Sequence, residues 1–454
     1  MGTQSMETAL VVAADSGNIA LVEQLVREGA NLHQKDANGR TALMAATQRN
    51  DIPMAKLLID AGSDVNARDI TQLTPYLCAG ANGFHEILKL AIAGGADIRS
   101  VNRFGGTALL PSSEKGYLRT VQLCLKAGIA VNHANNLGWS ALLESVILGD
   151  GGRLYADIIA ALVDAGADAG LNDRNGKSSL QHAEEMGQTR VVRILKGTLS
   201  ETGSVFDIIQ QAKALAAGED YEGALSEIEK GLLVEPASTD LLYYRGYFLS
   251  ELKRYEEAIA SYNKALEIDP AAIEFYFYTA NAYRLMKKPE EALREYDKAV
   301  ALKPEAPYHR YHKSNYLREL GRHEEAVGEM DALLKQQPNR YDYSFHKANS
   351  LRSLGRHEEA ATAIDNAITN DPTNPLYHFH KMQSLVLLGR MDDALAEIGI
   401  ALQYAPENPD YLCEKAAILA KLGDTAKAEE ALRAALSISP EHSRARAMSA
   451  GIGR

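Results

Sequence analysis

A strict 34-residue period runs from Val205 to His442 and limits what this half of the chain can fold into. Prolines recur once per period, at Pro236, Pro270, Pro304, Pro338, Pro372, Pro406 and Pro440. An alanine stands twelve residues before each proline, at Ala224, Ala258, Ala292, Ala326, Ala360, Ala394 and Ala428. A period of this length is typical of a solenoid, in which each unit buries its apolar face only against its neighbours. The period therefore favours binding over catalysis.

Each unit is predicted to be a helical hairpin. The proline ends the second helix, because it cannot donate its amide and excludes helix from the residue before it. A mostly small residue also precedes each proline by twenty-four positions, at Ala212, Gly246, Ala280, Ser314, Ala348, Met382 and Ala416. Small side chains here and at the recurrent alanine let the two helices of a hairpin approach closely. A bulky residue at Ala292 is expected to overpack that contact.

These features resemble the tetratricopeptide repeat over residues 205–442, in register through seven units. The sequence departs from the pattern at two places: no unit has the tryptophan often found at the fourth position, and the seventh becomes lysine in several units. The resemblance implies a superhelix whose first helices line a concave groove. The groove positions are the second, fifth, sixth, ninth, twelfth and thirteenth of each unit.

The first 200 residues carry a different period of 33. A Thr/Ser-Ala-Leu-like motif begins at Thr8, Thr41, Thr74, Thr107 and Ser140, and again at Ser178 after an insertion of five residues. Glycines follow the first four motifs by twenty-one residues, at Gly29, Gly62, Gly95 and Gly128. Two helices fit between motif and glycine, with the glycine ending the second. Asp36–Gly39 and Asp173–Gly176 have the composition of tight turns with positive φ.

This part resembles the ankyrin repeat, with six repeats over roughly residues 3–200. The predicted domains are therefore 1–200, with ankyrin repeats, and 201–454, with seven tetratricopeptide repeats and a short C-terminal cap. Gly197–Ser204 is expected to be a short boundary that flexes. The stretch Asn135–Glu144, followed by Gly149–Gly152, looks like a form seen in bacterial ankyrin proteins, so a bacterial source is expected. The glycine-rich insertion is interpreted as a tolerated loop.

Candidate binding residues recur at the groove positions. Aromatic and histidine side chains form one column: Tyr243, Phe277, Tyr311, Phe345, His312 and His346. Amide and guanidinium side chains form a second column: Asn281, Asn315, Asn349, Arg284, Arg318 and Arg352. Asparagine can bond an extended backbone without reading its side chains, and arginine suits carboxylates or phosphates. We expect a peptide with acidic groups, and Trp139, the one tryptophan, is a candidate anchor in the ankyrin half.

A structural interpretation remains open for each column. Asparagine and arginine could form a solvated face, with arginine pairing to residues such as Glu319, and the aromatic rings could pack between repeats. Trp139 could equally pack against Leu137 or the following hairpin. A chaperone adaptor that clamps C-terminal carboxylates usually has lysine at the fifth position, whereas this chain has aromatic residues there.

Composition excludes several other functions. The net charge of −12 argues against nucleic acid and anionic membranes as main partners. Cys78, Cys124 and Cys413 lie far apart, which fits a reducing cytoplasmic compartment, and the start lacks a signal peptide's features. His312, His346 and His380 are one repeat apart, too distant to share a metal ion. No catalytic, cofactor or metal-binding motif is found, so no enzyme activity and no cofactor are expected.

The sequence thus predicts an all-α protein of two α-solenoids in tandem, acting as a protein–protein interaction scaffold in the cytoplasm. Two alternatives remain. One is a chaperone-type adaptor that binds acidic C-terminal tails, and the other is a bacterial effector or regulator that acts by binding. The sequence does not identify the partner or the oligomeric state.

Overall fold

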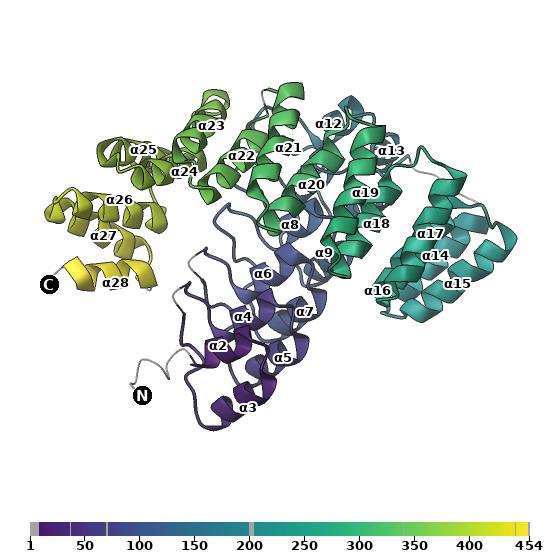
Figure 1. Ribbon diagram of the computed structural model, residues 1–454, viewed down its shortest axis with the longest axis horizontal. Coiled ribbons are helices and arrows are strands. Elements are labelled where there is room, and N and C mark those ends of the chain that lie inside the picture. The colour runs from purple at the N-terminus through teal and green to yellow at the C-terminus, as the bar shows by residue number, and fades with distance from the viewer. Residues whose placement is uncertain are drawn as a thin grey trace. The chain divides into compact units, whose positions relative to one another are not determined.

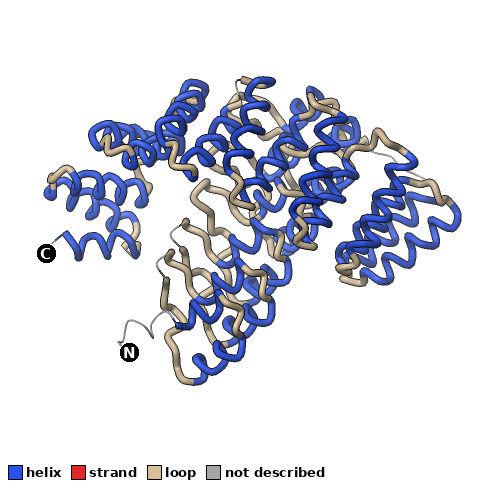
Figure 2. Tube along the Cα trace, in the orientation of Figure 1, coloured by secondary structure: helices blue, strands red, loops and turns tan. Residues whose placement is uncertain are grey.

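The computed structural model describes residues 9–36, 38–69, 71–198, 204–338, 340–440 and 442–452. Every regular element within these ranges is a helix (Figures 1 and 2). Two isolated β-bridges also occur, one between Ala134 and Ser140 and one between Asn172 and Ser178. The all-α prediction is confirmed. Residues 199–203 of the predicted boundary and 453–454 of the C-terminal tail lie outside the described ranges.

The N-terminal region is a series of short helical hairpins. Its helices are α2 (Ala9–Asp15), α3 (Ile19–Arg27), α4 (Ala42–Gln48), α5 (Ile52–Asp60), α6 (Pro75–Asn82), α7 (His85–Ala93), α8 (Leu109–Glu114), α9 (Leu118–Lys126), α10 (Ala141–Ile147), α11 (Arg153–Asp164), α12 (Ser179–Glu185) and α13 (Thr189–Leu195). The motif residue is the N-cap of several first helices, because its hydroxyl accepts from a backbone N–H one turn on, as from Leu77 to Thr74 at 3.1 Å. The predicted glycines follow the second helices with positive φ, 81° at Gly29 and 95° at Gly62.

The C-terminal region is a series of longer hairpins. Its helices are α14 (Ser204–Ala217), α15 (Tyr221–Val234), α16 (Thr239–Glu251), α17 (Tyr255–Ile268), α18 (Glu274–Leu285), α19 (Pro289–Leu302), α20 (Pro307–Glu319), α21 (His323–Gln336), α22 (Tyr341–Ser353), α23 (His357–Asn370), α24 (Pro375–Leu387), α25 (Met391–Tyr404), α26 (Pro409–Lys421), α27 (Thr425–Ile438) and α28 (Ser443–Ile452). Each second helix ends two residues before its proline, and the residue between them is extended, as at Asp269 with φ −130° and ψ 88°. The proline thus ends the helix as predicted.

Close helix approach explains the small residues of the period. The recurrent alanines are all fully buried, with 0% exposure from Ala224 to Ala428. A Cβ built on Gly246 would overlap the ring of Tyr262 in the second helix of the same hairpin. The second helix therefore fits against the first only because these positions have little or no side chain.

The chain divides into two compact units, Met1–Ala282 and Tyr283–Arg454. The N-terminal unit holds all the ankyrin-like hairpins, α14–α17 and most of α18. The C-terminal unit holds α19–α28. The compact units therefore do not coincide with the two predicted domains, 1–200 and 201–454.

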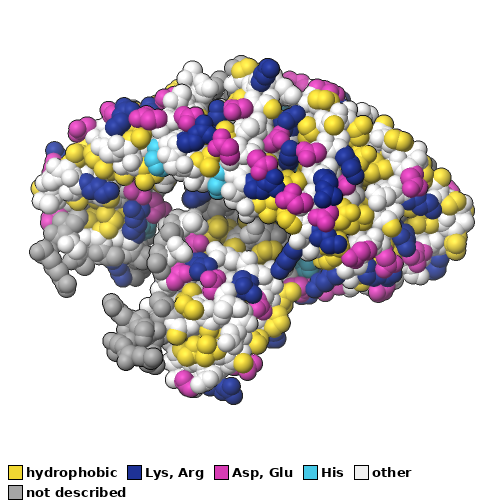
Figure 3. Space-filling model, in the orientation of Figure 1, with side chains coloured by type: hydrophobic (Ala, Val, Ile, Leu, Met, Phe, Trp, Pro, Cys, Tyr) yellow, Lys and Arg dark blue, Asp and Glu magenta, His cyan; other side chains and the backbone are white. Residues whose placement is uncertain are grey.

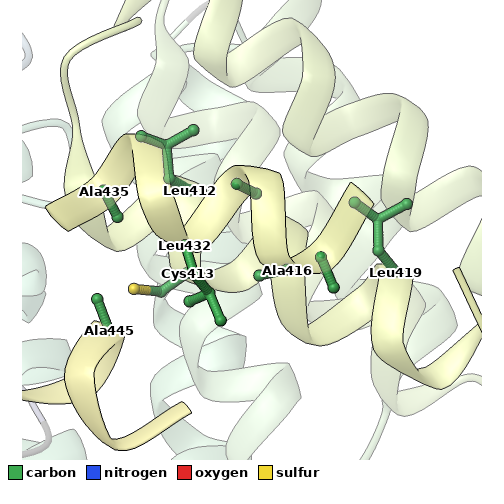
Figure 4. Close-up of a cluster of buried hydrophobic side chains, with 9 residues drawn as sticks. Leu412, Cys413, Ala416, Leu419, Leu432, Ala435 and Ala445 are labelled. Atoms are coloured by element: carbon green, nitrogen blue, oxygen red, sulfur yellow. The ribbon is translucent and has the colours of Figure 1, made fainter. Parts of the chain in front are cut away.

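The C-terminal unit ends in a helical cap. Helix α28 places Ala445, which is 0% exposed, against a buried cluster that includes Leu412, Cys413 and Leu432 (Figure 4). The last repeat would otherwise expose this apolar face, because a solenoid has no further neighbour at its end.

Ion pairs link successive second helices in the C-terminal unit. Arg356 pairs with Glu324 of the preceding repeat at 2.9 Å and with Glu359 of its own helix at 2.6 Å. Arg322 repeats the arrangement one unit earlier, with Glu290 at 3.0 Å and Glu325 at 2.5 Å. These side chains are solvent-accessible, so each ion pair adds little to the free energy of unfolding. The pairs connect neighbouring repeats at matching positions.

None of the described helices is long and apolar enough to cross a membrane.

A test of the close helix approach uses two alanines of helix α19. We expect Ala292→Leu to lower the free energy of unfolding by roughly 1 to 3 kcal/mol, because the added side chain overpacks a fully buried contact. Ala301→Leu is the matched control, since Ala301 is exposed on the same helix. Urea unfolding of the two variants measures the difference, and equal stability would contradict the packing argument.

Candidate functional site

The groove positions of the first tetratricopeptide-like hairpins are occupied by an ankyrin-region helix of the same unit. Arg153, the first residue of α11, pairs with Asp240 of α16 at 2.5 Å and with Glu274 of α18 at 2.6 Å. Its guanidinium also donates to Thr239 Oγ1 at 2.9 Å and lies 5.3 Å from the ring centre of Phe275. Asp240 and Glu274 are equivalent groove positions of successive repeats, so one arginine bridges two repeats.

One turn further along, α11 makes a second set of polar contacts. The carboxylate of Asp157 accepts from Tyr244 Oη at 3.0 and 2.9 Å and pairs with Lys213 of α14 at 2.7 Å. The backbone N–H of Leu154 donates to Tyr278 Oη at 3.2 Å. Burial, and then the nearby Asp157 carboxylate, hold the pKa of Tyr244 well above its usual value. The Tyr244 hydroxyl therefore stays protonated and donates to Asp157.

A third contact lies at the neighbouring ankyrin-region helix α9. Arg119 pairs with Glu251 of α16 at 3.4 Å and with Glu86 at 3.1 Å, and its guanidinium lies 5.0 Å from the ring centre of Tyr221. Lys89 of α7 pairs with Glu219 at 2.8 Å in a more exposed position. The two repeat types thus meet through charged side chains from at least three ankyrin-region helices.

The predicted aromatic site residues are buried. Tyr243 and Phe277 are each 1% exposed, and Phe277 lies 6.5 Å from the ring of Tyr155 in α11. Tyr311 is 2% and Phe345 5% exposed in the C-terminal unit. This burial favours the interpretation that these rings pack between elements rather than contact a partner.

Trp139 and His312 are buried in the same way, at 4% and 5% exposure. Trp139 directly precedes Ser140, the N-cap of α10, and its backbone N–H donates to Asn135 Oδ1 at 3.1 Å. The position places the indole inside the ankyrin region, which favours its packing interpretation.

The asparagine and arginine column of the C-terminal unit forms a repeated hydrogen-bonded arrangement. Arg318 Nη1 donates to Asn315 Oδ1 at 3.0 Å and to His346 Nδ1, one repeat further on, at 2.9 Å. Arg352 repeats it, donating to Asn349 Oδ1 and, at 2.8 Å, to the Nδ1 atom of His380.

The His346 imidazole serves as an acceptor here, because a guanidinium can only donate. Burial, followed by the charge of Arg318, lowers the pKa of His346 well below its usual value, so the ring is neutral. With Nδ1 accepting, His346 Nε2 carries the hydrogen and donates to Tyr311 Oη at 3.2 Å.

The bonds within this column leave several N–H donors unused in the described ranges. Arg318 uses only Nη1 in its hydrogen bonds, and it pairs with no carboxylate in the part of the chain that the structure describes. Asn315 and Asn349 are half-buried, and each uses only its carbonyl oxygen within those described ranges. Their amide NH₂ groups and the remaining Arg318 N–H groups can therefore donate to a ligand, and the ligand must supply acceptors.

Arg284 behaves differently from Arg318. It pairs with Glu319 of the following repeat at 3.6 Å, as the structural interpretation of the arginines anticipates. Asn281, which is half-buried, belongs to the other compact unit.

The face of the molecule in Figure 3 shows Lys and Arg side chains interspersed with Asp and Glu side chains.

Sequence reasoning missed the contact of α11, although a signal for it exists. The insertion before α11 interrupts the 33-residue period, and α11 has 12 residues where α9 has 9.

No group of three or more His, Cys, Asp or Glu side chains able to hold a metal occurs among the described residues.

Comparison with known proteins agrees with this architecture. The family model described as ankyrin repeats (3 copies) matches residues 2–69 and 76–173. Tetratricopeptide repeat models match 239–271, and 279–339, 311–375 and 383–443. The N-terminal region is therefore made of ankyrin repeats and the C-terminal region of tetratricopeptide repeats, which confirms the sequence-based assignment.

Three solved structures illustrate the likeness. An ankyrin repeat domain from Acinetobacter baumannii is 44% identical over 43% of this chain and 100% of its own, with a TM-score of 0.42. Another ankyrin repeat protein is 36% identical over 42% of this chain and 96% of its own, with a TM-score of 0.41. A chain from the complex of a Bdellovibrio bacteriovorus predatory endopeptidase with an immunity protein is 25% identical over 42% and 97%, with a TM-score of 0.37. No curated protein matches the chain.

Arg153 tests how strongly the two repeat types are joined. We expect Arg153→Ala to lower the free energy of unfolding of the N-terminal unit by about 1.5 to 3 kcal/mol, because it leaves Asp240 and Glu274 without their shared partner. Lys89→Ala breaks a more exposed pair across the same contact and should cost about 0 to 1 kcal/mol. Urea unfolding distinguishes them, and equal losses would show that Arg153 is not the stronger link.

His378 gives a separate test by pH. Its Nδ1 lies 2.7 Å from the Glu397 carboxylate and its Nε2 lies 2.9 Å from the carbonyl oxygen of Pro372, so both nitrogens face acceptors. Burial opposes the charged ring, but these hydrogen bonds outweigh it and raise the pKa of His378. Its contribution to stability is therefore complete below the unfolded pKa of about 6.5 and is lost as the pH rises through the folded value.

Urea unfolding between pH 5.5 and 8.5 measures this contribution. We expect the loss of stability with rising pH to be smaller in His378→Gln than in the wild type. His357→Gln is the control, because His357 Nδ1 has no hydrogen-bond partner among the described residues. A pH profile that is unchanged in His378→Gln would contradict the assignment.

Proposed function

We propose that the protein is an interaction scaffold whose C-terminal unit binds an acidic, extended peptide segment along the column Asn315, Arg318 and Asn349. Ankyrin and tetratricopeptide repeats are general protein–protein interaction modules. The observation that carries the proposal is that the bonds within this column, as described, use the Asn315 and Asn349 carbonyl oxygens but not their amide N–H groups, and only one nitrogen of Arg318. A peptide backbone and an acidic side chain supply the matching acceptors.

The charge of Arg318 supports the acidic character of the ligand. Its guanidinium is half-buried and bonded to a neutral histidine and an amide, neither of which offsets its charge. A carboxylate at the remaining N–H groups would form a charge-assisted hydrogen bond, which is about twice as strong as a neutral one. A phosphate would satisfy the same donors.

The first part of the groove is proposed to be closed to such ligands. In the N-terminal unit, groove positions Asp240, Tyr244, Glu274 and Tyr278 already contact α11. Partner binding is therefore assigned to the C-terminal unit.

Recognition of a free C-terminal carboxylate is the second candidate. Clamps of that kind use lysine at the fifth position, where this unit has the buried Tyr311 and Phe345. We therefore propose that an internal segment is bound.

A cytoplasmic location is proposed as well, because all three cysteines are unpaired and buried.

Binding of an immobilised array of ten-residue peptides tests the site. Immobilised peptides with Asp or Glu should retain the full-length protein, and peptides with Asn or Gln at the same positions should not. We expect Arg318→Ala to weaken retention at least about tenfold, which corresponds to about 1.4 kcal/mol. Arg433→Ala is the matched control, because Arg433 is an exposed arginine of the same unit away from the groove positions.

Three outcomes separate the alternatives. Equal retention by Arg318→Ala, with an unchanged helical circular dichroism spectrum, would reject the proposed site. Loss of retention when only the peptide C-terminus is amidated would favour the carboxylate-clamp function instead. Retention should also fall with added salt, since the contact is ionic.

A further inference from the structure

The inserted glycine-rich loop before α11 has a defined structure that turns one carboxyl group inward. Gly151 has φ +71°, which favours glycine, and a Cβ on Gly149 would overlap the carbonyl oxygen of Ser145. The Gln188 side chain, 6% exposed, donates to the carbonyl oxygens of Val146 at 2.9 Å and Gly149 at 3.1 Å. Gln188 therefore holds the loop at two carbonyl oxygens, and Asp150 lies just before the start of α11.

The carboxyl of Asp150 is only partly satisfied. Its Oδ1 accepts from the backbone N–H of Gly152 at 2.8 Å, whereas its Oδ2 is buried with no hydrogen-bond partner in the described chain. Burial, and then the negative charge of Glu274, raise the pKa of Asp150 to about 7, while the Gly152 N–H and Arg153 act in the opposite direction. The group therefore changes charge near neutrality.

The charges around Asp150 come from every element at this contact. Glu274 and Tyr278 face it from α18, and Arg153 faces it from α11. Asp240 of α16 completes the network through Arg153 and, at 3.5 Å, through Arg190 of α13. Two guanidinium groups thus lie near three carboxyl groups, of which Asp240 and Glu274 form the ion pairs. Ionisation of Asp150 leaves one negative charge in excess beside Glu274.

We propose that the contact of α11 with α16 and α18 is a proton-controlled latch, closed while Asp150 carries its proton and loosened when the carboxyl ionises. Loosening exposes the groove positions Asp240, Tyr244, Glu274 and Tyr278, which α11 otherwise occupies. The latch therefore controls access to the N-terminal part of the tetratricopeptide groove. It is independent of the peptide site around Arg318.

The pH range follows from the two protonation equilibria. In the loosened state Asp150 has its ordinary pKa of 3.8, and in the closed state about 7. The stabilisation of the closed state is therefore complete below about pH 4, declines up to pH 7 and is lost above it. Between pH 5.5 and pH 8 the ratio of closed to loosened molecules should fall about 30-fold, which is the ratio these two values give. His85, which contacts Arg119 at the same interface, has its pKa lowered to about 4 and stays neutral over this range.

Pulsed electron paramagnetic resonance on the full-length chain measures the opening. Nitroxide labels are placed at Gln122→Cys on α9 and Lys264→Cys on α17, both exposed sites in the N-terminal unit, and the three native cysteines are buried. The wild-type background should give one narrow distance distribution at pH 5.5 and a broader, longer one at pH 8. Asp150→Asn mimics the protonated carboxyl and should stay narrow at both values.

The control variants keep the test decisive. Asp150→Ser retains an acceptor for the Gly152 N–H but cannot ionise, so it serves if the asparagine variant does not fold. A wild-type distribution that is identical at both pH values would overturn the proposal. A pH response that persists in both Asp150 variants would also overturn it, because another group would then control the opening.

Discussion

Each hairpin of this protein can bury its apolar face only against the next hairpin, and this constraint determines where small residues must stand. Fully buried alanines such as Ala292, and the glycine Gly246 against Tyr262, let the two helices of a hairpin come close enough to share one core. The same constraint leaves a bare face at the end of an array, which helix α28 covers through Ala445.

Other groove positions carry polar side chains that make contacts beyond their own hairpin. In the N-terminal unit these contacts are made to an ankyrin helix of the same chain. Arg153 of helix α11 bridges Asp240 and Glu274. Asp157 of the same helix accepts from Tyr244 and Lys213. Helix α11 thus occupies groove positions that a bound peptide would contact in other repeats. Charged side chains join the two repeat types, and the proposed latch depends on the protonation of one carboxyl among them.

In the C-terminal unit other groove positions bond to each other along the array. Arg318 and Arg352 each connect an asparagine of their own repeat to a histidine of the next. These bonds use the asparagine carbonyl oxygens and leave the amide N–H donors unused in the described ranges. A repeated polar column of this kind links successive repeats, and it is the column that we propose as the peptide site.

The sequence by itself determined the hairpins, because their signals are local. Proline ends each second helix, Thr74 and its equivalents cap the first helices of the ankyrin region, and glycines such as Gly62 take the positive φ that follows the second. It also placed Asn315, Arg318 and Asn349 in one column through helical spacing. The tertiary structure decided what each side chain meets: Tyr243 and Trp139 became buried, and Arg284 paired with Glu319. Only the tertiary structure could bring Arg153 to Asp240 and Glu274, because contacts between residues so distant in sequence depend on how the arrays pack, and no periodic pattern records that.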